Sequence, residues 1–360
     1  MEPVAQRLVS QLLAGERAND PVHVARRLLA VQAQDPRGMR LAIRARSHAL
    51  SASDVDRALS HDRSLVVTWL NRGTLHLVAS EDYAWLHALT TPPLFTASAR
   101  RLAQERVTPA AAERGVSTIA RALERDGPLD RAQLRERLDA AGVRTQGQAL
   151  VHLLLLASLR ALIVRGPVHG SSHAYVLTRD WLGEQPRVER QRALAELARR
   201  YLRGHAPADD RDLARWSGLP LRDARAGLHA IAGELLQRED GLLALARTSP
   251  PAPRERRPRR AASPRTREPP PPAAPPLLLG AFDPLLLGWR SREQLLGADA
   301  RIVTTNGIFR PFALVRERAV ATWTLSRARV ELRPFARIAP ADERALRADG
   351  EDVLRFLRRD

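Results

Sequence analysis

The chain has 360 residues, a formal net charge of +18 and no cysteine. The lack of cysteine excludes disulfides and thiolate metal sites, and the length predicts two to four modules rather than one small core. All 58 basic residues are arginines, because the sequence contains no lysine. This bias is consistent with GC-rich codons and equally with a phosphate-binding surface, since one arginine can pair with two phosphate oxygens.

Neither a signal peptide nor a membrane span is predicted. Charges are spread through the first 20 positions, where a signal peptide would have an apolar core. The longest apolar runs, such as LVHLLLLASL at 150–159, are too short to cross a bilayer. We therefore expect a cytoplasmic protein with no membrane partner.

The first part of the chain, residues 1–95, is predicted to combine helices with a hairpin. Asp20 is a candidate N-cap, Pro21 would take the first helical position, and apolar residues continue along one helical face to Val31. The remaining expected elements are a helix at 51–62, strands at 64–70 and 74–78 around the turn Asn71-Arg72-Gly73, and a helix from Ser80.

The same plan recurs twice. In residues 96–184 we expect helices at 115–127, 128–142 and 145–161, then two strands within 162–178. In residues 185–247 we expect helices at 190–205, 209–219 and 220–239, then a weak strand at 241–246. Helices followed by a hairpin are typical of the winged-helix variant of the helix-turn-helix. Three tandem winged-helix motifs therefore fit residues 1–247.

The last third of the chain differs in composition and period. Residues 248–276 hold eleven prolines and seven arginines, which predicts an extended, disordered linker. Residues 277–360 form a small β-rich module in this reading. It would contain a hairpin turn at Asn306-Gly307, strands at 319–325 and 329–335, and terminal helices from 341. The predicted fold class is α+β and mainly helical.

Two glutamines stand where the helix that begins at Pro21 must end. Gln32 and Gln34 are two residues apart, so their side chains point the same way only if the backbone there is extended. Pro36 favours such a geometry, because a proline biases the preceding residue, Asp35, out of the helical region. A polar helix end is the alternative interpretation of the pair.

Four arginines follow the glutamines, at positions 37, 40, 44 and 46. Arg37, Arg40, Arg44 and Arg46 would make a phosphate clamp, although an arginine-rich solvated face explains each of them equally well. Near the other end of the chain, Asn306, Phe309 and Arg310 surround the predicted hairpin tip. Such a tip could probe a DNA groove, whereas Phe309 could equally be core.

Three further residues are candidates for a site. Asp283 is a lone acid in an apolar stretch, so it is either a turn aspartate or an acid facing a groove, where it would stabilise positive charge. Arg72 and His76 belong to the predicted first hairpin, and Arg72 is a candidate contact to DNA. His76 is either a core or strand-surface residue or a contact to DNA or within the active site. We find no nucleotide-binding glycine motif, no GxSxG elbow and no HExxH spacing. No metal and no cofactor are expected.

Four stretches resemble a known family when taken in order. They are LLAVQAQDPRG (28–38), VVTWLNRGTLHLVASEDYAWL (66–86), LLLGAFDPLLLGWRSR (277–292) and GIFRPFALVRERAVATWTL (307–325). Together they are similar to the AlkZ/YcaQ-like DNA glycosylase superfamily, whose members are often described only as winged-helix DNA-binding proteins. The resemblance runs from about residue 5 to 355, and the arginine-proline linker looks longer than usual for the superfamily.

The resemblance implies three winged-helix motifs and a β-rich C-terminal region that clasp double-stranded DNA. It also implies a catalytic Gln-x-Gln motif, which falls on Gln32 and Gln34. Members of the superfamily remove bulky or cationic alkylated bases, and some unhook interstrand crosslinks. The expected partner is alkylated double-stranded DNA, bound by a monomer in the nucleoid.

Glutamine does not titrate near neutral pH, so it cannot act as a general base. A purine alkylated at N7 or N3 is cationic and leaves as a neutral base, so the enzyme needs mainly to position water. We therefore predict a monofunctional DNA glycosylase that cuts charged adducts and not neutral lesions such as uracil. The alternatives are a winged-helix DNA-binding protein or transcriptional regulator without catalysis, and a descendant of the fold that binds a nucleotide or a protein.

Overall fold

The computed structural model describes residues 3–169, 172–246, 272–297 and 301–358. Most of the predicted linker, from residue 248 to 271, lies outside the described residues. The first part of the chain alternates short helices with a hairpin, as predicted. Its elements are α1 (Pro3–Ser10), α2 (Pro21–Leu28), β1 (Val31–Gln32), α3 (Pro36–Arg44), α4 (Ala52–Ser60), β2 (Leu65–Leu70), η1 (Asn71–Gly73), β3 (Thr74–Ala79), η2 (Ser80–Asp82) and α5 (Tyr83–Thr90).

The next two parts each place helices before a hairpin. The second part contains α6 (Leu94–Gln104), α7 (Pro109–Asp126), α8 (Arg131–Ala140), α9 (Ala149–Leu159), β4 (Ile163–His169), β5 (Ser172–Leu177) and α10 (Thr178–Leu182). The third contains α11 (Arg190–His205), α12 (Asp210–Ser217), α13 (Leu221–Ala230), η3 (Ala232–Glu234), β6 (Leu235–Gln237) and β7 (Leu243–Leu245). Capping boxes begin α4, α8 and α12, so local polar residues fix where these helices start.

The C-terminal module is built on one antiparallel sheet, in the order β11-β10-β9-β8. Its elements are β8 (Leu277–Leu279), η4 (Pro284–Leu286), α14 (Glu293–Leu296), β9 (Phe312–Val315), β10 (Arg318–Ser326), β11 (Arg329–Pro334) and α15 (Pro340–Leu357). The strands predicted at 319–325 and 329–335 are present. The Asn306-Gly307 turn is present too, but only an isolated bridge between Val303 and Phe309 flanks it.

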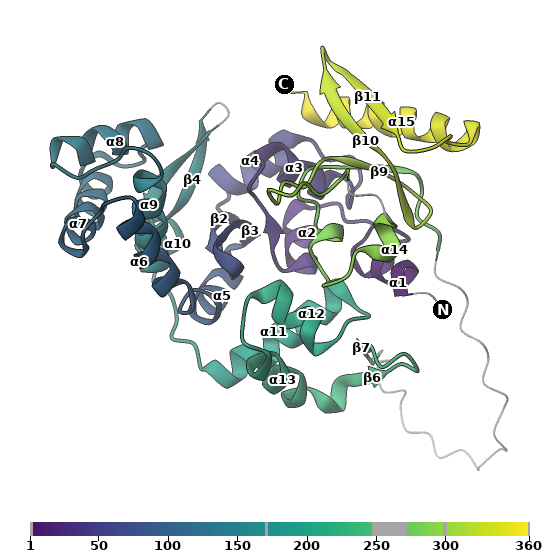
Figure 1. Ribbon diagram of the computed structural model, residues 1–360, viewed down its shortest axis with the longest axis horizontal. Coiled ribbons are helices and arrows are strands. Elements are labelled where there is room, and N and C mark those ends of the chain that lie inside the picture. Colours follow the sequence, from purple (N-terminus) through teal and green to yellow (C-terminus); the bar gives the residue numbers. More distant parts are fainter. Residues whose placement is uncertain (1–2, 170–171, 247–271, 298–300, 359–360) are drawn as a thin grey trace.

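The first two hairpins share one sheet, which the sequence analysis did not anticipate. Its strand order is β1-β3-β2-β4-β5, and Val67 of β2 pairs with Arg165 of β4. Figure 1 shows the helices of the second part at one end of the molecule and α15 with β10 and β11 at another, with α2 and α3 between them. Helices α11–α13 lie along the remaining side. The first part contacts each of the other parts, through β2 with β4, α2 with α11 and α3 with β8.

Two buried apolar clusters support this arrangement. One combines α2, α3, the first sheet and the second part with α15, and the other combines α1, α11–α13 and β8 with β9. The fold is α+β with small antiparallel sheets, in agreement with the predicted class. The winged-helix assignment and the boundaries at 95, 184 and 247 stay predictions. In the part of the chain that the structure describes, no helix is long and apolar enough to cross a membrane.

Candidate active site

The chain leaves the helix just before the two glutamines. α2 ends at Leu28, and Leu29 adopts a φ of +65°, which turns the chain out of the helix. Val31 therefore lies in strand β1 and not, as predicted, on the apolar face of the helix. β1 pairs with β3, and this register sets Gln32 directly opposite His76. The two side chains share one face of the sheet, since paired residues in antiparallel strands point the same way.

Gln32 lines a pocket of about 190 Å³. Only 7% of Gln32 is exposed, and among the described residues no group hydrogen-bonds to its side-chain amide. The pocket draws on three parts of the chain: the first hairpin, α12 and the C-terminal module. Its other lining residues are Arg72, Thr74, Arg215, Leu287, Trp289, Arg292, Gly307 and Phe309. The structure thus brings together one predicted glutamine, the first hairpin turn and the C-terminal turn.

Gln34 is exposed and does not line this pocket. Asp35, which follows it, has the extended backbone expected before a proline, with φ −113° and ψ 114°. Its carboxylate accepts a hydrogen bond from the backbone N–H of Gly38, so Asp35 caps α3 and Pro36 takes the first helical position. The two glutamines are therefore held between a paired strand and a capped helix, and Gln34 keeps a free surface position beside the pocket residue.

Three arginines converge on the pocket. Arg72 donates to the backbone carbonyls of Arg215 and Trp216, which fixes the first hairpin turn against α12. Burial, followed by the positive charges of Arg215 and Arg292, lowers the pKa of Arg72 to about 10. Arg215 and Arg292 were missed by the sequence analysis. Arg292 stands in one of the four family-like stretches, whereas nothing local to Arg215 distinguishes it from the many other arginines.

His76 is a buried neutral support for Gln32 rather than a contact to DNA, which corrects one of the predicted alternatives. It is 3% exposed. Burial, then the charge of Arg72, lowers its pKa to about 3, although the hydrogen bond to the Thr74 carbonyl opposes this shift. Because that carbonyl can only accept, Nδ1 carries the proton and donates to it.

The depressed pKa of His76 predicts a loss of stability in acid. Below the unfolded-state pKa of 6.5 the unfolded chain binds a proton at this position, whereas the folded chain does not until the pH approaches 3. The folded state therefore loses stability as the pH decreases from 6.5 to 3. Between pH 7.5 and pH 5.5, the free energy of unfolding of wild type should decrease by about 1.4 kcal/mol more than that of His76→Gln. Denaturant unfolding at both pH values measures this. Equal losses in the two proteins would contradict the prediction, and packing changes cancel because each protein is compared with itself.

The predicted hairpin tip is exposed around Asn306, as expected for a probing loop. Thr304 and Ile308 close the turn, with the Thr304 N–H donating to the Ile308 carbonyl over 2.9 Å. Phe309 is half-buried and packs against Phe282, with ring centroids 5.6 Å apart, so it forms a wall of the pocket. Arg310 is exposed beyond it. A DNA contact by Asn306, Phe309 or Arg310 stays a prediction.

Most of the predicted phosphate clamp is wrong. Arg40 pairs with Asp56. Arg44 is buried and forms ion pairs with both Asp349 and Asp352 of α15. Arg46 is fully buried. Each of these three arginines forms an ion pair with a carboxylate inside the protein, so they hold parts of the fold together. Of the four, only Arg37 is exposed and remains a candidate to contact DNA.

The groove-facing role considered for Asp283 is also wrong. Asp283 has no exposed surface and forms two hydrogen bonds with Arg46, at 2.8 and 2.9 Å. Its carboxylate additionally accepts from the backbone N–H of Leu285 over 2.9 Å, which is the turn interaction that the sequence analysis gave as the other possibility. Asp283 therefore joins η4 to the end of α3 and cannot reach the pocket around Gln32.

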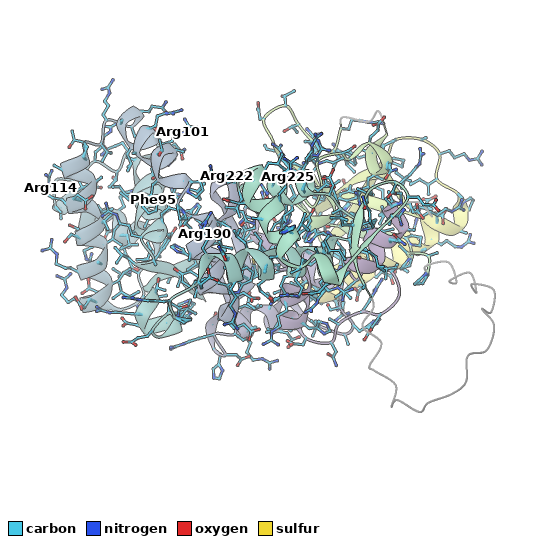
Figure 2. All side chains as sticks on the ribbon, turned by 90° about the horizontal axis from the view of Figure 1, so that it is seen from below. Phe95, Arg101, Arg114, Arg190, Arg222 and Arg225 are labelled. Carbon is cyan, nitrogen blue, oxygen red and sulfur yellow. The ribbon has the colours of Figure 1, made fainter. Side chains whose placement is uncertain are left out.

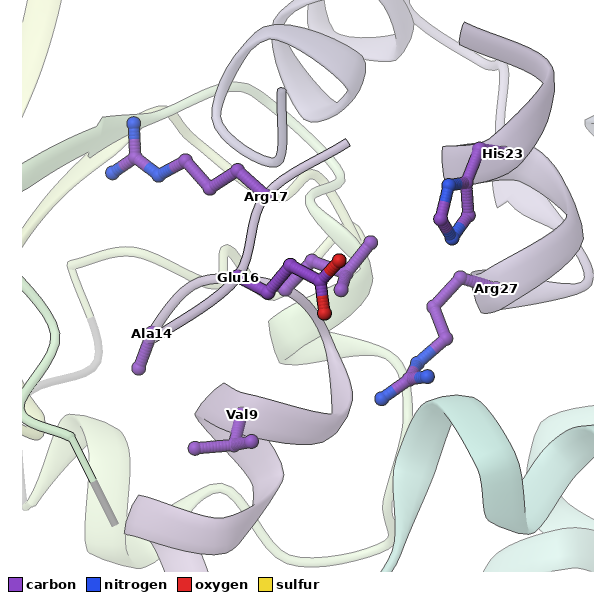
Figure 3. A pocket seen from close by; sticks show the side chains of 7 residues that line it. Val9, Ala14, Glu16, Arg17, His23 and Arg27 are labelled. Carbon is purple, nitrogen blue, oxygen red and sulfur yellow. The ribbon is translucent and has the colours of Figure 1, made fainter. Parts of the chain in front are cut away.

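A second hollow contains none of the predicted site residues. It measures about 120 Å³, lies between the end of α1 and the start of α2, and is lined by Glu16, Arg17, His23 and Arg27 among others. Figure 3 shows the Glu16 carboxylate near the centre of this view, with Arg17 on one side and His23 and Arg27 on the other. Within the described residues, no group of three or more histidine, aspartate or glutamate side chains could hold a metal ion.

Two comparisons with known proteins found a match. The family model described as DNA glycosylase AlkZ-like matches residues 25–356. Among solved structures, the chain is similar to Streptomyces sahachiroi DNA glycosylase AlkZ, with a TM-score of 0.73 and 23% sequence identity over 98% of this chain and 95% of that one. At that identity the structural likeness speaks for the fold. The comparison with curated proteins found no match.

Proposed function

The chain belongs to the AlkZ-like DNA glycosylase family, and from this premise we propose that it hydrolyses the N-glycosidic bond of cationic alkylated purines in double-stranded DNA. The substrates in this proposal are N7 and N3 adducts, with interstrand crosslinks as a further possibility for an open site. The observation that carries it is the position of Gln32, whose unpaired amide opens onto a pocket lined by arginines.

Gln32 suits a reaction that needs orientation more than proton transfer. Its carbonyl oxygen can accept a hydrogen bond from the attacking water and face the positive charge that develops on the sugar. The neighbouring His76 is neutral across the physiological range because burial lowers its pKa to about 3, so it adds no cation beside that sugar. The substrate must therefore supply its own leaving-group activation, as a cationic purine does.

Gln34 has a second role in this proposal. It is exposed in the present structure, two residues beyond the paired strand, and does not line the pocket. Its amide is thus available to a bound substrate that covers the surface beside Gln32. We propose that Gln34 holds the water or a sugar oxygen from that side, and that Asn306, Phe309, Arg310 and Arg37 contact the duplex around it.

Base release from methylated DNA tests the proposal. Wild-type protein incubated with a duplex carrying N7-methylguanine should produce abasic sites, detected as strand breaks after alkali and heat. Gln32→Ala should release base roughly 100-fold more slowly, the typical cost of removing one group that stabilises a transition state. Gln34→Ala should also be slower, while both variants still bind the duplex.

The matched control is Gln104→Ala, an exposed glutamine at the end of α6 that lies outside the pocket; it should cut like wild type. A uracil-containing duplex should remain intact in every case. Tight binding to one undamaged sequence without base release would instead identify a non-catalytic regulator. Unchanged release by both glutamine variants would show that the catalytic site lies elsewhere.

A further inference from the structure

We propose that Arg72, Arg215 and Arg292 together bind one backbone phosphate of the strand that carries the lesion, next to the sugar that reacts at Gln32. This inference rests on the proposed function and gives the pocket its ligand class, a phosphodiester. It assigns a binding role to two arginines, Arg215 and Arg292, that the Gln-x-Gln motif does not include.

The three guanidinium groups lack the acidic partners that most arginines near the site have. Arg40, Arg44 and Arg46 each pair with an aspartate. Among residues with described positions, no carboxylate pairs with Arg72, Arg215 or Arg292, and no acid lines their pocket. Like charges placed close together in a half-enclosed space need an anion, since each raises the electrostatic cost of the others.

A hydroxyl group without a hydrogen-bond partner also belongs to a residue of this pocket. Thr74 lines it, and the hydroxyl of this residue is shielded from solvent and has no hydrogen-bond partner among the described residues. A phosphate has enough acceptor oxygens to satisfy this hydroxyl as well as several guanidinium N–H groups. An unfilled hydroxyl beside unpaired cations therefore favours an oxyanion over an apolar occupant.

Two of the arginines are held in place before any ligand binds. Arg72 donates to the backbone carbonyls at the end of α12. The turn that follows α12 packs closely against this residue, because a Cβ on Gly218 would lie 2.8 Å from the backbone nitrogen of Arg72. Arg292 lies over the Phe309 ring, 5.1 Å from its centroid. Fixed arginines lose little side-chain freedom on binding, which is a property of built anion sites.

A phosphate bound by these arginines would also help the reaction at Gln32. Glycosidic cleavage places positive charge on the sugar, and three unneutralised guanidinium groups nearby would oppose it. A phosphate from the same strand removes that opposition and fixes the position of its own sugar. Arg215 and Gly307 are exposed at the pocket, so a strand can enter from their side.

A scan with neutral methylphosphonate linkages tests the inference. Duplexes carrying N7-methylguanine would each have one linkage near the lesion replaced, and the rate of base release would be measured. In wild type, one linkage should slow release roughly tenfold to a hundredfold, as expected for losing a charged hydrogen-bonded contact. In Arg292→Ala and in Arg215→Ala, the same replacement should cause little further loss. Arg215 is exposed, so its variant keeps the test valid if Arg292→Ala fails to fold.

The matched control is Arg114→Ala on α7, an exposed arginine at the far end of the molecule from the C-terminal module (Figure 2). This variant should keep the full effect of the sensitive linkage. The inference is overturned if no linkage near the lesion matters, or if the sensitive linkage stays equally sensitive in both pocket variants. If no base is released at all, the proposed function fails separately. Equilibrium binding to the same series with a tetrahydrofuran abasic analogue then decides the phosphate site.

Discussion

Replacing Asp283 by asparagine should destabilise the folded chain by about 3–5 kcal/mol, because it leaves Arg46 as a buried cation without its counter-charge. Neither side chain has exposed surface, and the guanidinium and carboxylate meet through two hydrogen bonds. Arg46 also donates to Gln11 and to the Ala42 carbonyl, so the pair sits at a junction of α1, α3 and η4. The shift in the midpoint of guanidinium denaturation measures the loss.

Two further variants test whether the loss of stability comes from leaving a buried charge without its partner. Glu81→Gln removes an exposed pair with Arg26 and should cost less than about 1 kcal/mol. The double variant Arg46→Met/Asp283→Leu removes both buried charges, and it should recover most of the lost stability. A folded double variant should still release methylated base at the wild-type rate, because Asp283 does not reach the pocket. Lost activity in a folded double variant would restore Asp283 as a catalytic residue.

The wrong prediction of a groove-facing role for Asp283 shows where local sequence patterns stop being informative. A single acid among leucines is equally consistent with a groove and with a buried pair, and the deciding partner is Arg46, 237 positions earlier in the chain. The same holds for Arg44, which is neutralised by aspartates on the last helix. Sequence spacing alone cannot separate arginines that face solvent from those that pair across modules.

The end of the helix before Gln32 was predictable because it is set locally. The chain leaves the helix after Leu28, and Asp35 before Pro36 is extended, as expected from the sequence. The pairing of β1 with β3 was not predicted, because its partner residues stand far along the chain, at positions 76 and 77. Arg215 was not predictable, since its place in the pocket depends on how α12 packs against the first hairpin turn.

The elements of the fold were easier to predict than their assembly. The start of α2 followed from the cap Asp20 and the proline after it, and the strands at 319–325 and 329–335 followed from β-branched and aromatic residues. In contrast, the pairing of Val67 with Arg165 merges two predicted hairpins into one sheet. That pairing joins strands nearly a hundred residues apart, and neither strand carries a local signal for it.

Gly38→Ala is the second substitution with a large expected effect, about 3 kcal/mol of lost stability. A Cβ at position 38 would lie 2.3 Å from the backbone oxygen of Ala281, and it would also crowd the carbonyl carbon and the nitrogen of that residue. Gly280, the residue before Ala281, is equally close: a Cβ built on it would lie 2.9 Å from the Gly38 Cα. Neither backbone can yield by rotating a side chain, so the cost reaches the upper end of the range for overpacking.

Gly233→Ala is the matched control, because a Cβ there meets no atom within 4 Å. It should leave the denaturation midpoint nearly unchanged, whereas Gly38→Ala should lower it clearly. Activity should also fall in Gly38→Ala at temperatures where it is folded, since the close contact fixes α3, whose cap follows Gln34 directly. If Gly38→Ala is as stable and as active as wild type, α3 does not need the C-terminal module at this distance, and the glutamines are positioned by strand β1 alone.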